Sequence, residues 1–559
     1  MCGIAGYFGF AEISNMRLDQ CMEAMRRRGP DDEGRITREI SCGRNLYLIH
    51  SRLSVIDLDE RSRQPFEHAG DLLCYNGEIY NYLELKSSLR MAGYSFSTSS
   101  DTEVLAQYLS QNGMKNISSC EGMWAFAWFD HNSENLFLCR DRFGEKPLYY
   151  YEDESGVYFG SEPKFIFALL GKNLAINPEH LRRFLVHGYK SLYKNGETFF
   201  SDLREVVPGC YRRYGPDGND EQRYWSPNLN AQDRTLTYDD FVELTKSALV
   251  RSVELRLRAD VPIAFCLSGG VDLNALISIA KRKLGYDVHG FTIMNTDERY
   301  EEREMVETAI DSLGLRHTEV PVSTDNFMSN LRELIKYHDA PIYTITYYAQ
   351  WQLMEAVKRA GYKVSVSGTA ADELFSGYYD HHNAYIAAMR YYGKTHYEKA
   401  LENWGRVVKP IVRNPYLQDP EYFVKHPESR DHIILGADVF SSMLKEPFNE
   451  DFGEVSYAKE LLRNRMANEL FHESVPVILH EDDLNAMYHS IENRSPFLDT
   501  ALFEVAQSIP TEHLIQNGIA KSVLREAVRG LAPDAIIDNP RKVGFNAPLF
   551  DYLDVKILR

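Results

Sequence analysis

The sequence contains little that would direct the protein to a membrane or to nucleic acid. No apolar run reaches the ~18 residues that suggest a bilayer span, and the start lacks the basic-then-apolar order of a secretion signal. The 62 basic residues form no basic stripe, and 81 acidic residues bring the net charge to −19. We therefore expect a soluble protein whose partners are neither nucleic acids nor anionic membranes.

Paired cysteines are also missing. None of the eight cysteines lies in a CxxC pair, and all of them fall in the first half of the chain: Cys2, Cys21, Cys42, Cys74, Cys120, Cys139, Cys210 and Cys266. Zinc sites and secreted disulfide frameworks are recognised by regular cysteine spacing. This distribution therefore predicts a reduced, cytoplasmic protein without zinc.

Two common nucleotide-binding patterns are absent as well. The GKT at 393–395 does not complete a Walker loop, because Ala388 stands where the first glycine of that loop would be. No GxGxxG follows a strand in the sheet-forming region. Any nucleotide site in this chain therefore uses another kind of loop.

The first part of the chain has the pattern of a β-rich domain. At 559 residues and 44% hydrophobic content, the chain can form two to four domains of roughly 150 residues each. Residues 1–215 consist of short apolar runs between turn residues, with helical patterns at 16–27 and 82–93. Such spacing predicts an α+β domain with layered antiparallel sheets.

The pattern changes after a polar stretch. Residues 216–236 are rich in Gly, Pro, Asn and Asp, which indicates a connector between domains. In residues 237–559, buried strands are separated by helix-length segments, and from about 380 the pattern is mostly helical. Widely spaced strands imply crossover connections, so this part is predicted to be an α/β domain with a parallel sheet and a helical carboxyl-terminal part.

The opening MCGIAGYFGF places a thiol among small residues at the chain terminus. If Met1 is removed, the free α-amine of Cys2 can accept the proton of its own thiol, which activates the sulfur as a nucleophile. Backbone N–H groups and an asparagine amide can then hold the oxygen of a tetrahedral intermediate. On its position alone, an idle terminal thiol is the commoner explanation.

Four further segments favour the catalytic explanation. They are RRRGPDDEG at 26–34, SRLSVIDL at 51–58, YNGEIYNY at 75–82 and SSDTEV at 99–104. With CGIAG, this set resembles the glutaminase domain of the amino-terminal-nucleophile amidotransferases, in particular that of the glutamine-dependent asparagine synthetases. The resemblance implies the αββα fold of the Ntn hydrolases. It also implies that Cys2 is the nucleophile and that Asn76 and Gly77 form the oxyanion hole.

The same resemblance implies a binding site for glutamine. Arg52 would pair with the α-carboxylate, Glu78 and Asp101 would hold the α-ammonium, and Asn76 would contact the substrate. A guanidinium fork and carboxylates complement the two charges of a free amino acid. One departure is visible, because the family usually has histidine where this chain has Arg27.

The back half contains a second chemical pattern, FCLSGGVDLNAL at 265–276. A glycine turn between a buried strand and a helix exposes N–H groups that suit pyrophosphate, and Asp272 could share a magnesium ion with the phosphates. In isolation this SGG turn is more often structural. It resembles the pyrophosphatase-type loop of enzymes that split ATP to AMP and pyrophosphate to adenylate carboxylates.

Other segments follow in the order of the asparagine synthetase carboxyl domain: 367–378, 481–499, 521–527 and 539–549. The resemblance implies a fold of the adenine nucleotide alpha hydrolase type that binds ATP and Mg²⁺. It places adenosine against Leu267, Ile293 and Gly368, phosphates against Ser268, Gly269, Gly270 and Ser367, and magnesium on Asp272 and Asp372, with Lys542 neutralising charge in the transition states.

Simpler explanations exist for single residues of this set. Asp372 and Glu373 could cap a helix, since acidic residues are common in a first turn. Lys542 could be solvated. His381 and His382 are adjacent, so they do not share a helix face, and we do not expect them to bind a metal.

Two departures fall inside the chemistry. Leu273 replaces the serine that usually ends the SGGVDS-type loop, so a hydroxyl that could bond a phosphate is absent. Thr369 replaces the acid of the second loop, and threonine cannot accept a proton near neutral pH. Three explanations stay open: a different acceptor or nucleophile, a base such as Glu373, or a synthetase half with little activity.

The sequence therefore predicts a glutamine-dependent ligase of the asparagine synthetase type. Glutamine hydrolysis would release ammonia, and ATP would adenylate aspartate or a related acid. Two alternatives remain at this stage: ring closure as in β-lactam-forming synthetases, which usually lack a working amino-terminal cysteine, and a degenerate protein that binds without turnover. A homodimer is implied only by family likeness.

Overall fold

The computed structural model describes residues 1–41, 43–194, 196–229, 231–294, 302–448 and 450–541, together with Ala547 and Tyr552. Its front half contains two six-stranded sheets, and every strand pairing in them is antiparallel. The first sheet has the order β10-β8-β9-β1-β3-β2 and the second β12-β11-β7-β6-β5-β4. The α+β fold predicted from the spacing of apolar runs is confirmed.

The strands of the first sheet are β1 Gly3–Gly9, β2 Asp32–Glu39, β3 Asn45–Arg52, β8 Tyr149–Asp153, β9 Gly156–Gly160 and β10 Leu203–Glu205. Those of the second sheet are β4 Phe66–His68, β5 Asp71–Ile79, β6 Gly122–Asp130, β7 Asn135–Arg140, β11 Cys210–Gly215 and β12 Gly218–Arg223. The helices of this half are α1 Asn15–Met25, α2 Tyr82–Met91, α3 Asp101–Asn112, α4 Pro163–Leu170 and α5 Pro178–His187.

Side chains of β1 show why the sheets form layers. Ile4 and Phe8 point into the core between the two sheets, whereas Ala5 and Tyr7 point to the opposite face, against α1 and α4. Successive strand residues alternate between faces, so a strand that is apolar on both sides lies buried inside a layered structure. Helices α2 and α3 cover the outer face of the second sheet in the same way. The result is an αββα arrangement.

The polar stretch predicted as a connector begins as a strand. Residues 218–223 form β12, which pairs with β11 at the edge of the second sheet. Its side chains are mostly exposed, which explains the polar sequence GNDEQR. An edge strand with one solvent-exposed face has no apolar alternation to distinguish it from a loop.

The back half is built on a parallel sheet with the strand order β15-β14-β13-β16-β17. Its strands are β13 Ile263–Cys266, β14 His289–Met294, β15 Arg316–Pro321, β16 Val364–Val366 and β17 Glu492–Arg494. The helices around it are α6 Tyr238–Arg256, α7 Val271–Ser278, α8 Arg303–Leu313, α9 Phe327–His338, α10 Ile345–Arg359 and α17 Val475–Tyr488. This confirms the predicted α/β class.

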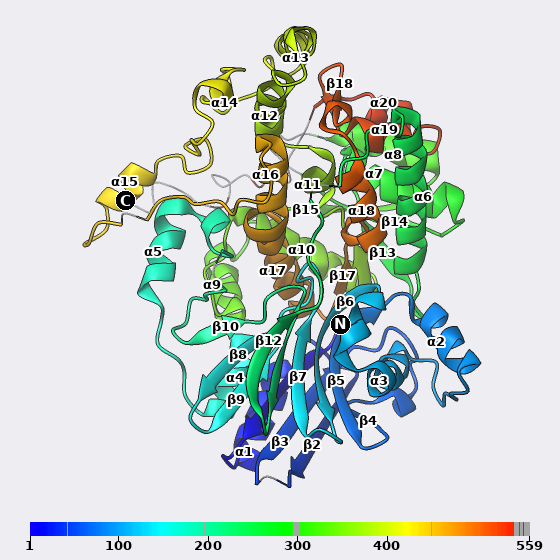
Figure 1. Cartoon of the computed structure of the whole chain (residues 1–559), viewed down its shortest axis with the longest axis vertical. Coiled ribbons are helices and arrows are strands. Elements are labelled where there is room, and N and C mark those ends of the chain that lie inside the picture. Colours follow the sequence, from blue (N-terminus) through cyan, green and yellow to red (C-terminus); the bar gives the residue numbers. More distant parts are fainter. Residues whose placement is uncertain are drawn as a thin grey trace.

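The helical carboxyl-terminal part lies above this sheet in Figure 1. Its helices are α11 Ala371–Phe375, α12 Tyr379–Met389, α13 Lys394–Val407, α14 Tyr422–Lys425, α15 Ala437–Ser442, α16 Leu461–Asn468, α18 Thr500–Ser508, α19 Ser522–Ala527 and α20 Asp534–Ile537. A small hairpin joins β18 Ile515–Gln516 to β19 Ile519–Ala520. Within the described ranges, no helix combines the length and the apolar character needed to cross a bilayer.

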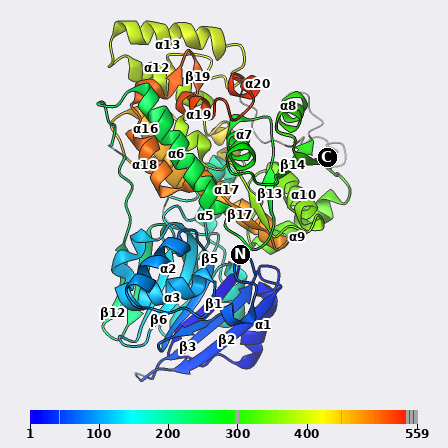
Figure 2. The same ribbon diagram turned by 90° about the vertical axis from the view of Figure 1, so that its right-hand side faces the viewer.

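The two halves pack directly on each other, and the amino terminus lies at their junction (Figure 2). One continuous apolar cluster contains Met1, Leu53, Met123 and Phe143 of the front half together with core residues of the back half. The strand β17 forms the edge of the parallel sheet, and its Glu492 contacts the amino terminus of Met1. The junction therefore brings Cys2, the predicted nucleophile, close to the parallel sheet of the back half.

Candidate active sites

Cys2 lies just before β1, in the interior of the molecule. Its backbone N–H donates to Asn76 Oδ1 over 3.0 Å, and its Sγ lies 3.9 Å from the carbonyl oxygen of Leu53. Burial raises the pKa of the Cys2 thiol, and the positive amino terminus nearby opposes that shift. At neutral pH the sulfur is thus protonated, and it needs a base before it can attack.

Met1 occupies the place beside this thiol. Its ammonium lies 3.1 Å from Glu492 Oε2, and the residue is only 1% exposed. Although burial disfavours a charged carboxyl, the amino terminus and Arg494 lower the pKa of Glu492 to about 2. While Met1 is present, the nitrogen of Cys2 is an amide and cannot act as a base.

Asn76 and Gly77 lie on β5, directly beside Cys2. The Asn76 side chain accepts from Cys2 through its oxygen, and its buried Nδ2 has no hydrogen-bond partner among the described residues. A Cβ added to Gly77 would lie 2.1 Å from the carbonyl oxygen of Met123 on β6, so only glycine fits there. An unpaired buried amide next to a thiol is a donor available to a developing oxyanion.

The predicted glutamine-binding residues surround the same thiol. The charges of Arg52 and Glu78 both act on the pKa of Cys2, and Asp101 acts in turn on Glu78. Asp101 accepts hydrogen bonds from the Tyr75 hydroxyl over 2.9 Å and from the backbone N–H of Ile79 over 3.0 Å. The structure thus brings this predicted set together at one place.

Glu78 and Arg52 differ in whether their polar atoms already have hydrogen-bond partners. Burial and the carboxylates of Glu492 and Asp101 raise the pKa of Glu78 well above its usual range, and Glu78 Oε2 has no partner among the described residues. Arg52 donates to the backbone carbonyls of Asp57 and, over 2.9 Å, Asp59. A substrate ammonium would relieve the buried carboxyl, because opposite charge favours its ionised form.

Arg28 lies in the RRRGPDDEG segment, and no role was predicted for it. Its guanidinium is fully buried and donates to the carbonyl of Cys2 over 3.0 Å, to Glu162 over 2.8 Å and to Asp483 over 2.7 and 3.2 Å. Asp483 belongs to α17 of the back half. This pairing spans 455 positions in the sequence, so no local pattern could reveal it. Arg27, the noted departure, lies outside the site, stacked over the ring of Tyr488 at 4.0 Å.

The predicted pyrophosphate loop lies at the carboxyl end of the parallel sheet. Leu267 to Gly270 connect β13 to α7, and Asn274 Nδ2 holds the turn by donating to the carbonyls of Ser268 over 2.9 Å and Gly270 over 2.8 Å. Ile293 lies on the neighbouring β14, and Ser367 and Gly368 follow β16. Open parallel sheets bind their ligands at this end, at the point where the strand order reverses and the connections from neighbouring strands leave toward opposite sides.

Asp272 and Asp372 converge on one ammonium that the sequence analysis did not single out. Lys521 Nζ lies 2.6 and 2.7 Å from the two oxygens of Asp272 and 2.6 Å from Asp372 Oδ1. A Cβ on Gly377 would lie 1.7 Å from Asp372 Oδ1 and 2.3 Å from Lys521 Cε, so this pairing requires glycine there. Lys521 belongs to the KSVLREA segment at 521–527. That segment was recognised only by its place in the order of the family's segments, which did not indicate the role of this lysine.

Cationic groups line a cavity beside Asp272. Besides Asp272 and Lys521, the cavity is lined by Arg525 and Arg541, at the point where the chain continues to the segment of Lys542. Such a lining suits phosphate groups. Lys542 itself lies outside the described residues, so the structure does not place this predicted residue.

The two departures from the family pattern are neighbours in space. A Cβ on Gly368 would lie 3.4 Å from Leu273 Cδ2 and 3.3 Å from Asp272 Cβ, so Leu273 packs against the second loop. Thr369 Oγ1 lies 3.1 Å from Ser367 Oγ. Glu373, the alternative base, is buried and accepts a hydrogen bond from Tyr378; burial raises the pKa of Glu373 to about 7.

One cluster of potential metal ligands lies outside both sites. Asp380, His381 and Glu469 are buried and have ligand atoms within 4.8 Å of one another. Arg465 lies 2.7 Å from Glu469 and 3.6 Å from Asp380, and His381 contacts Glu469 at 2.6 Å. A guanidinium at this position already balances the carboxylates and would repel a cation. The cluster is therefore a buried ion network of the back half.

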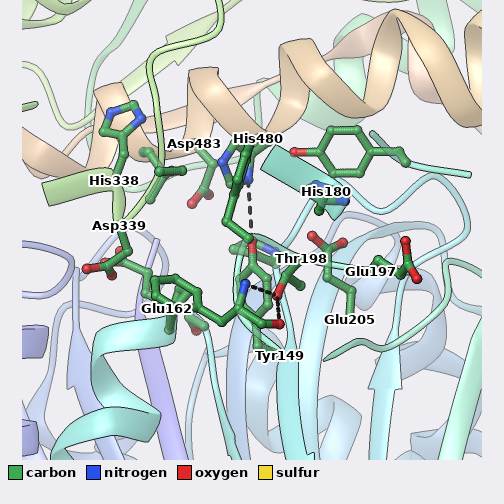
Figure 3. A pocket seen from close by; sticks show the side chains of 18 of the residues that line it. Tyr149, Glu162, His180, Glu197, Thr198, Glu205, His338, Asp339, His480 and Asp483 are labelled. Carbon is green, nitrogen blue, oxygen red and sulfur yellow. Dashed lines mark hydrogen bonds between the residues drawn. The ribbon is translucent and has the colours of Figure 1, made fainter. Parts of the chain in front are cut away.

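A small cavity lies between the halves (Figure 3). Tyr149, Glu162 and Glu205 line it from the front half, and His480 and Asp483 from the back half; the Tyr149 hydroxyl lies 3.4 Å from His480 Nδ1. Its volume of about 30 Å³ leaves room for water but not for glutamine or a nucleotide. It borders Glu162 and Asp483, the carboxylate partners of Arg28.

Comparisons with known proteins cover nearly the whole chain. Residues 1–225 match the glutamine amidotransferase domain family, and residues 244–559 match the asparagine synthase family. The glutamine-hydrolyzing asparagine synthetases 1 and 3 of Bacillus subtilis (strain 168) are 28% and 27% identical; the alignments cover 99% and 96% of this chain and 88% and 86% of theirs. Amidase chry2 of Gibberella zeae is 25% identical over 97% of this chain and 88% of its own.

Proposed function

Because this chain belongs to the asparagine synthase family, we propose that it is a glutamine-dependent amidotransferase that makes an amide at the expense of ATP. Residues 1–215 would release ammonia from glutamine, and residues 237–559 would consume it. The observation that carries the proposal is the Cys2 site at the junction of the two halves. There a buried thiol lies beside two buried polar atoms, Asn76 Nδ2 and Glu78 Oε2, that have no hydrogen-bond partner among the described residues.

The front reaction begins once Met1 has been removed. The α-amine of Cys2 takes the thiol proton, and the sulfur bonds to the side-chain carbonyl carbon of glutamine. The Asn76 amide and the N–H of Gly77 stabilise the resulting oxyanion. The carbon–nitrogen bond then breaks, the amine returns its proton to the departing nitrogen, and ammonia leaves. Water hydrolyses the thioester to glutamate.

Charge complementarity positions glutamine for this attack. Arg52 would hold the α-carboxylate, while Glu78 and Asp101 would hold the α-ammonium. Burial raises the pKa of both carboxyls, so a bound cation is what makes their ionised forms favourable. The site therefore prefers a substrate that carries both charges.

The back reaction adenylates the acceptor. Leu267, Ile293 and Gly368 would contact adenosine, and Ser268, Gly269, Gly270 and Ser367 would contact the phosphates. An acceptor carboxylate oxygen bonds to the α-phosphorus of ATP and pyrophosphate leaves. Ammonia then attacks the acyl carbon, and AMP departs from the new amide.

Asp272 and Asp372 fit a magnesium ion. Their oxygens converge on one point, where Lys521 Nζ lies, and Mg²⁺ prefers carboxylate and phosphate oxygens. Unlike the cation-balanced cluster at Asp380, this site would receive Mg²⁺ together with the ATP phosphates, whose negative charge would offset that of Lys521. Bound Mg²⁺ would act as a Lewis acid on the phosphates. Lys521 and Lys542 would neutralise the negative charge that develops there.

We propose aspartate as the acceptor, in line with the names of the two Bacillus subtilis relatives. The relative named as an amidase, and the altered second loop at Thr369, make a wider carboxylate screen worthwhile. From family likeness we also propose a homodimer, which sedimentation analysis of the purified protein would test.

The deciding experiment uses the trimmed full-length protein, with loss of Met1 verified by intact mass. Incubation with glutamine, Mg-ATP and aspartate should yield glutamate, AMP, pyrophosphate and asparagine in equal amounts. AMP that forms only with another carboxylate would overturn aspartate but not amide synthesis. Absence of glutamate under every condition would overturn the proposed function as a whole.

A further inference from the structure

Thr369 stands at the end of a chain of hydrogen bonds that runs to Asp482, a buried carboxyl of α17. Ser367 Oγ lies 3.1 Å from Thr369 Oγ1, Asn493 Nδ2 lies 3.1 Å from Ser367 Oγ, and the same Nδ2 lies 3.3 Å from Asp482 Oδ2. Asn493 belongs to β17, the edge strand next to β16. The chain thus connects the altered second loop to the interior of the back half.

At the Asp482 end of this chain of hydrogen bonds, the donors and acceptors are fixed. Asn485 Nδ2 donates to the backbone carbonyl of Tyr347 over 2.9 Å and to Gln350 Oε1 over 2.7 Å. Because a carbonyl only accepts, the Asn485 amide cannot be reversed, and Gln350 must present its oxygen to it. Gln350 therefore donates through Nε2 to Asp482 Oδ1.

An ionised Asp482 carries this direction to the second loop. A carboxylate only accepts hydrogen bonds, so Asn493 must turn its Nδ2 toward it. The other hydrogen of that amide then goes to Ser367, while Asn493 Oδ1 accepts from Ser365 over 3.0 Å. Ser367 Oγ is thereby an acceptor, and its own hydrogen is left for Thr369.

Thr369 then has one hydrogen to offer. Its Oγ1 accepts from Ser367 and has no other hydrogen-bond partner within the described ranges of the chain. We propose that this chain orients the Thr369 hydroxyl as a hydrogen-bond donor to the acyl oxygen of the adenylated acceptor, so that the second loop stabilises an oxyanion where its relatives place an acid. This inference rests on the proposed function.

The reaction balances without a base at position 369. Ammonia forms the carbon–nitrogen bond, and the carbonyl π pair moves onto the acyl oxygen, which the Thr369 hydroxyl stabilises. The pair then returns, the bond from carbon to the phosphate oxygen breaks, and AMP leaves. The surplus proton on nitrogen passes to the departing phosphate.

The charge of Asp482 controls which atoms donate and which accept along the hydrogen bonds from Asp482 to Thr369. Burial raises the pKa of Asp482 to about 7. Once protonated, Asp482 can donate, so the Asn493 amide can reverse, Ser367 donates to Asn493, and the Thr369 hydrogen turns back to Ser367. The charged or titratable groups that act on or respond to Asp482 are Lys146, Cys266, Tyr347, Glu481 and Asp483.

The first test compares Thr369→Val with Thr369→Ser, using aspartate, Mg-ATP and ammonium chloride as probes. The valine variant keeps the shape but loses the donor, and should form asparagine about 10²-fold more slowly, whereas the serine variant should stay within about threefold of the unmodified enzyme. Glutaminase activity at Cys2 serves as the folding control. An unchanged rate in Thr369→Val would overturn the inference.

The second test, Asp482→Asn, reverses the chain without removing it. Since Gln350 must still donate, the introduced amide turns its oxygen to Gln350 and its NH₂ to Asn493, which then reverses. In the unmodified enzyme, protonation of Asp482 should make asparagine formation slower below pH 7. In Asp482→Asn we expect the rate to be about tenfold lower or more and no longer to fall below pH 7. Ser365→Ala leaves the donors and acceptors as they are, so its rate should still fall below pH 7.

Two results would contradict the inference in this second test. One is an Asp482→Asn enzyme whose rate equals that of the unmodified protein and still falls below pH 7. The other is a Ser365→Ala enzyme whose rate no longer falls below pH 7. A failure of the proposed function is recognised separately, because the unmodified enzyme would then make no AMP from aspartate. In that case an aspartyl-adenylate analogue with a sulfamate linkage tests the chain by binding alone: Thr369→Val should weaken it and Thr369→Ser should not.

Discussion

The two active-site regions differ in how their residues are brought together. In the front region, Cys2, Arg52 and Asn76 lie on or next to strands of two packed sheets, and their backbone positions are fixed by antiparallel ladders. In the back region, Asp272 and Asp372 lie in the first turns of α7 and α11, and Lys521 lies just before α19. Lys521 and Asp272 are 249 positions apart. The first site is built on neighbouring strands, and the second where three helices begin.

The two regions also differ in how closely their residues are packed. A substitution beside Cys2 would meet close neighbours from adjacent strands, as the 2.1 Å approach of Met123 to a Cβ on Gly77 illustrates. The second loop instead gains an alternative polar partner, since Thr369 bonds to Ser367 and, through it, to Asn493. Loop residues vary more readily than strand residues, so a loop can acquire a side chain of different chemistry where a strand cannot.

The largest expected effect separates the two regions completely. Cys2→Ala should abolish glutamine-dependent synthesis, because no other group at that position can form the thioester. Asparagine formation from ammonium chloride should persist, since the back site is intact. Glutamate and asparagine are assayed in parallel with each nitrogen source. Loss of ammonium-dependent synthesis would mean that the two regions are not independent.

Removing the shared cation should affect only the back region. Lys521→Ala leaves Asp272 and Asp372 facing each other and removes a positive charge from the pyrophosphate, so AMP formation should drop by about 10²-fold or more. Glutaminase activity should stay unchanged. Lys281→Ala, which removes another lysine of the same half, is the matched control. Equal rates in Lys521→Ala and the control would contradict the assignment.

Breaking the ion pair between the halves should affect both regions. Arg28→Met leaves Asp483 and Glu162 buried without their partner, which costs about 3–5 kcal/mol for an interior pair. Urea unfolding of the variant and of Arg26→Met, an exposed neighbour, measures the difference. Unchanged stability in Arg28→Met would show that the apolar cluster and the other ion pairs between the halves, such as Arg256 with Glu121, hold them together without this pair.

The same pair gives a pH dependence with a defined sign. Burial opposes ionisation, but Arg28 and Lys146 lower the pKa of Asp483 below its usual range. The stability that Asp483 contributes is therefore present above the ordinary carboxyl pKa and is lost as pH falls through its lowered value. Asp483→Asn should remove this part of the acid sensitivity in thermal melts recorded from pH 6 downward.

The smallest effect is expected at Leu273. Leu273→Ser would restore the hydroxyl usual in the family, and a new hydrogen bond to phosphate would change the KM for ATP by about tenfold at most. Its kcat should change less, because Thr369 and its partners are untouched. Initial rates at varied ATP concentration separate the two constants. A large gain in kcat would show that this leucine, and not the second loop, limits the back region.

The sequence predicted those features that depend on local pattern. Apolar runs separated by turn residues indicated the antiparallel sheets, and a buried strand followed by SGG indicated the turn between β13 and α7, whose binding of phosphate stays a prediction. Strand β17 was not predicted, because its three residues, Glu492 to Arg494, are polar and follow a helical stretch. Its burial comes from the domain junction, which local alternation cannot encode.

Features that depend on distant parts of the chain could not be predicted. Arg28 is one of three consecutive arginines, and only the fold distinguishes it from Arg27 at the surface and Arg26 in solvent. The pairing of Lys521 with two acids, and the bonding of Asp482 to Asn493, likewise need the tertiary arrangement. Each involves charges or amides whose sequence environment resembles an ordinary helix or turn.

The burial of Met1 has a consequence for the history of each molecule. An aminopeptidase cannot reach a residue that is 1% exposed between the two halves. On the proposed Cys2 mechanism, Met1 would therefore have to be removed from the nascent chain, before folding is complete, and copies that fold first would stay inactive. Specific activity should therefore scale with the trimmed fraction seen by mass spectrometry, and overproduction that outruns the host's peptidase should yield abundant, well-folded and inert protein.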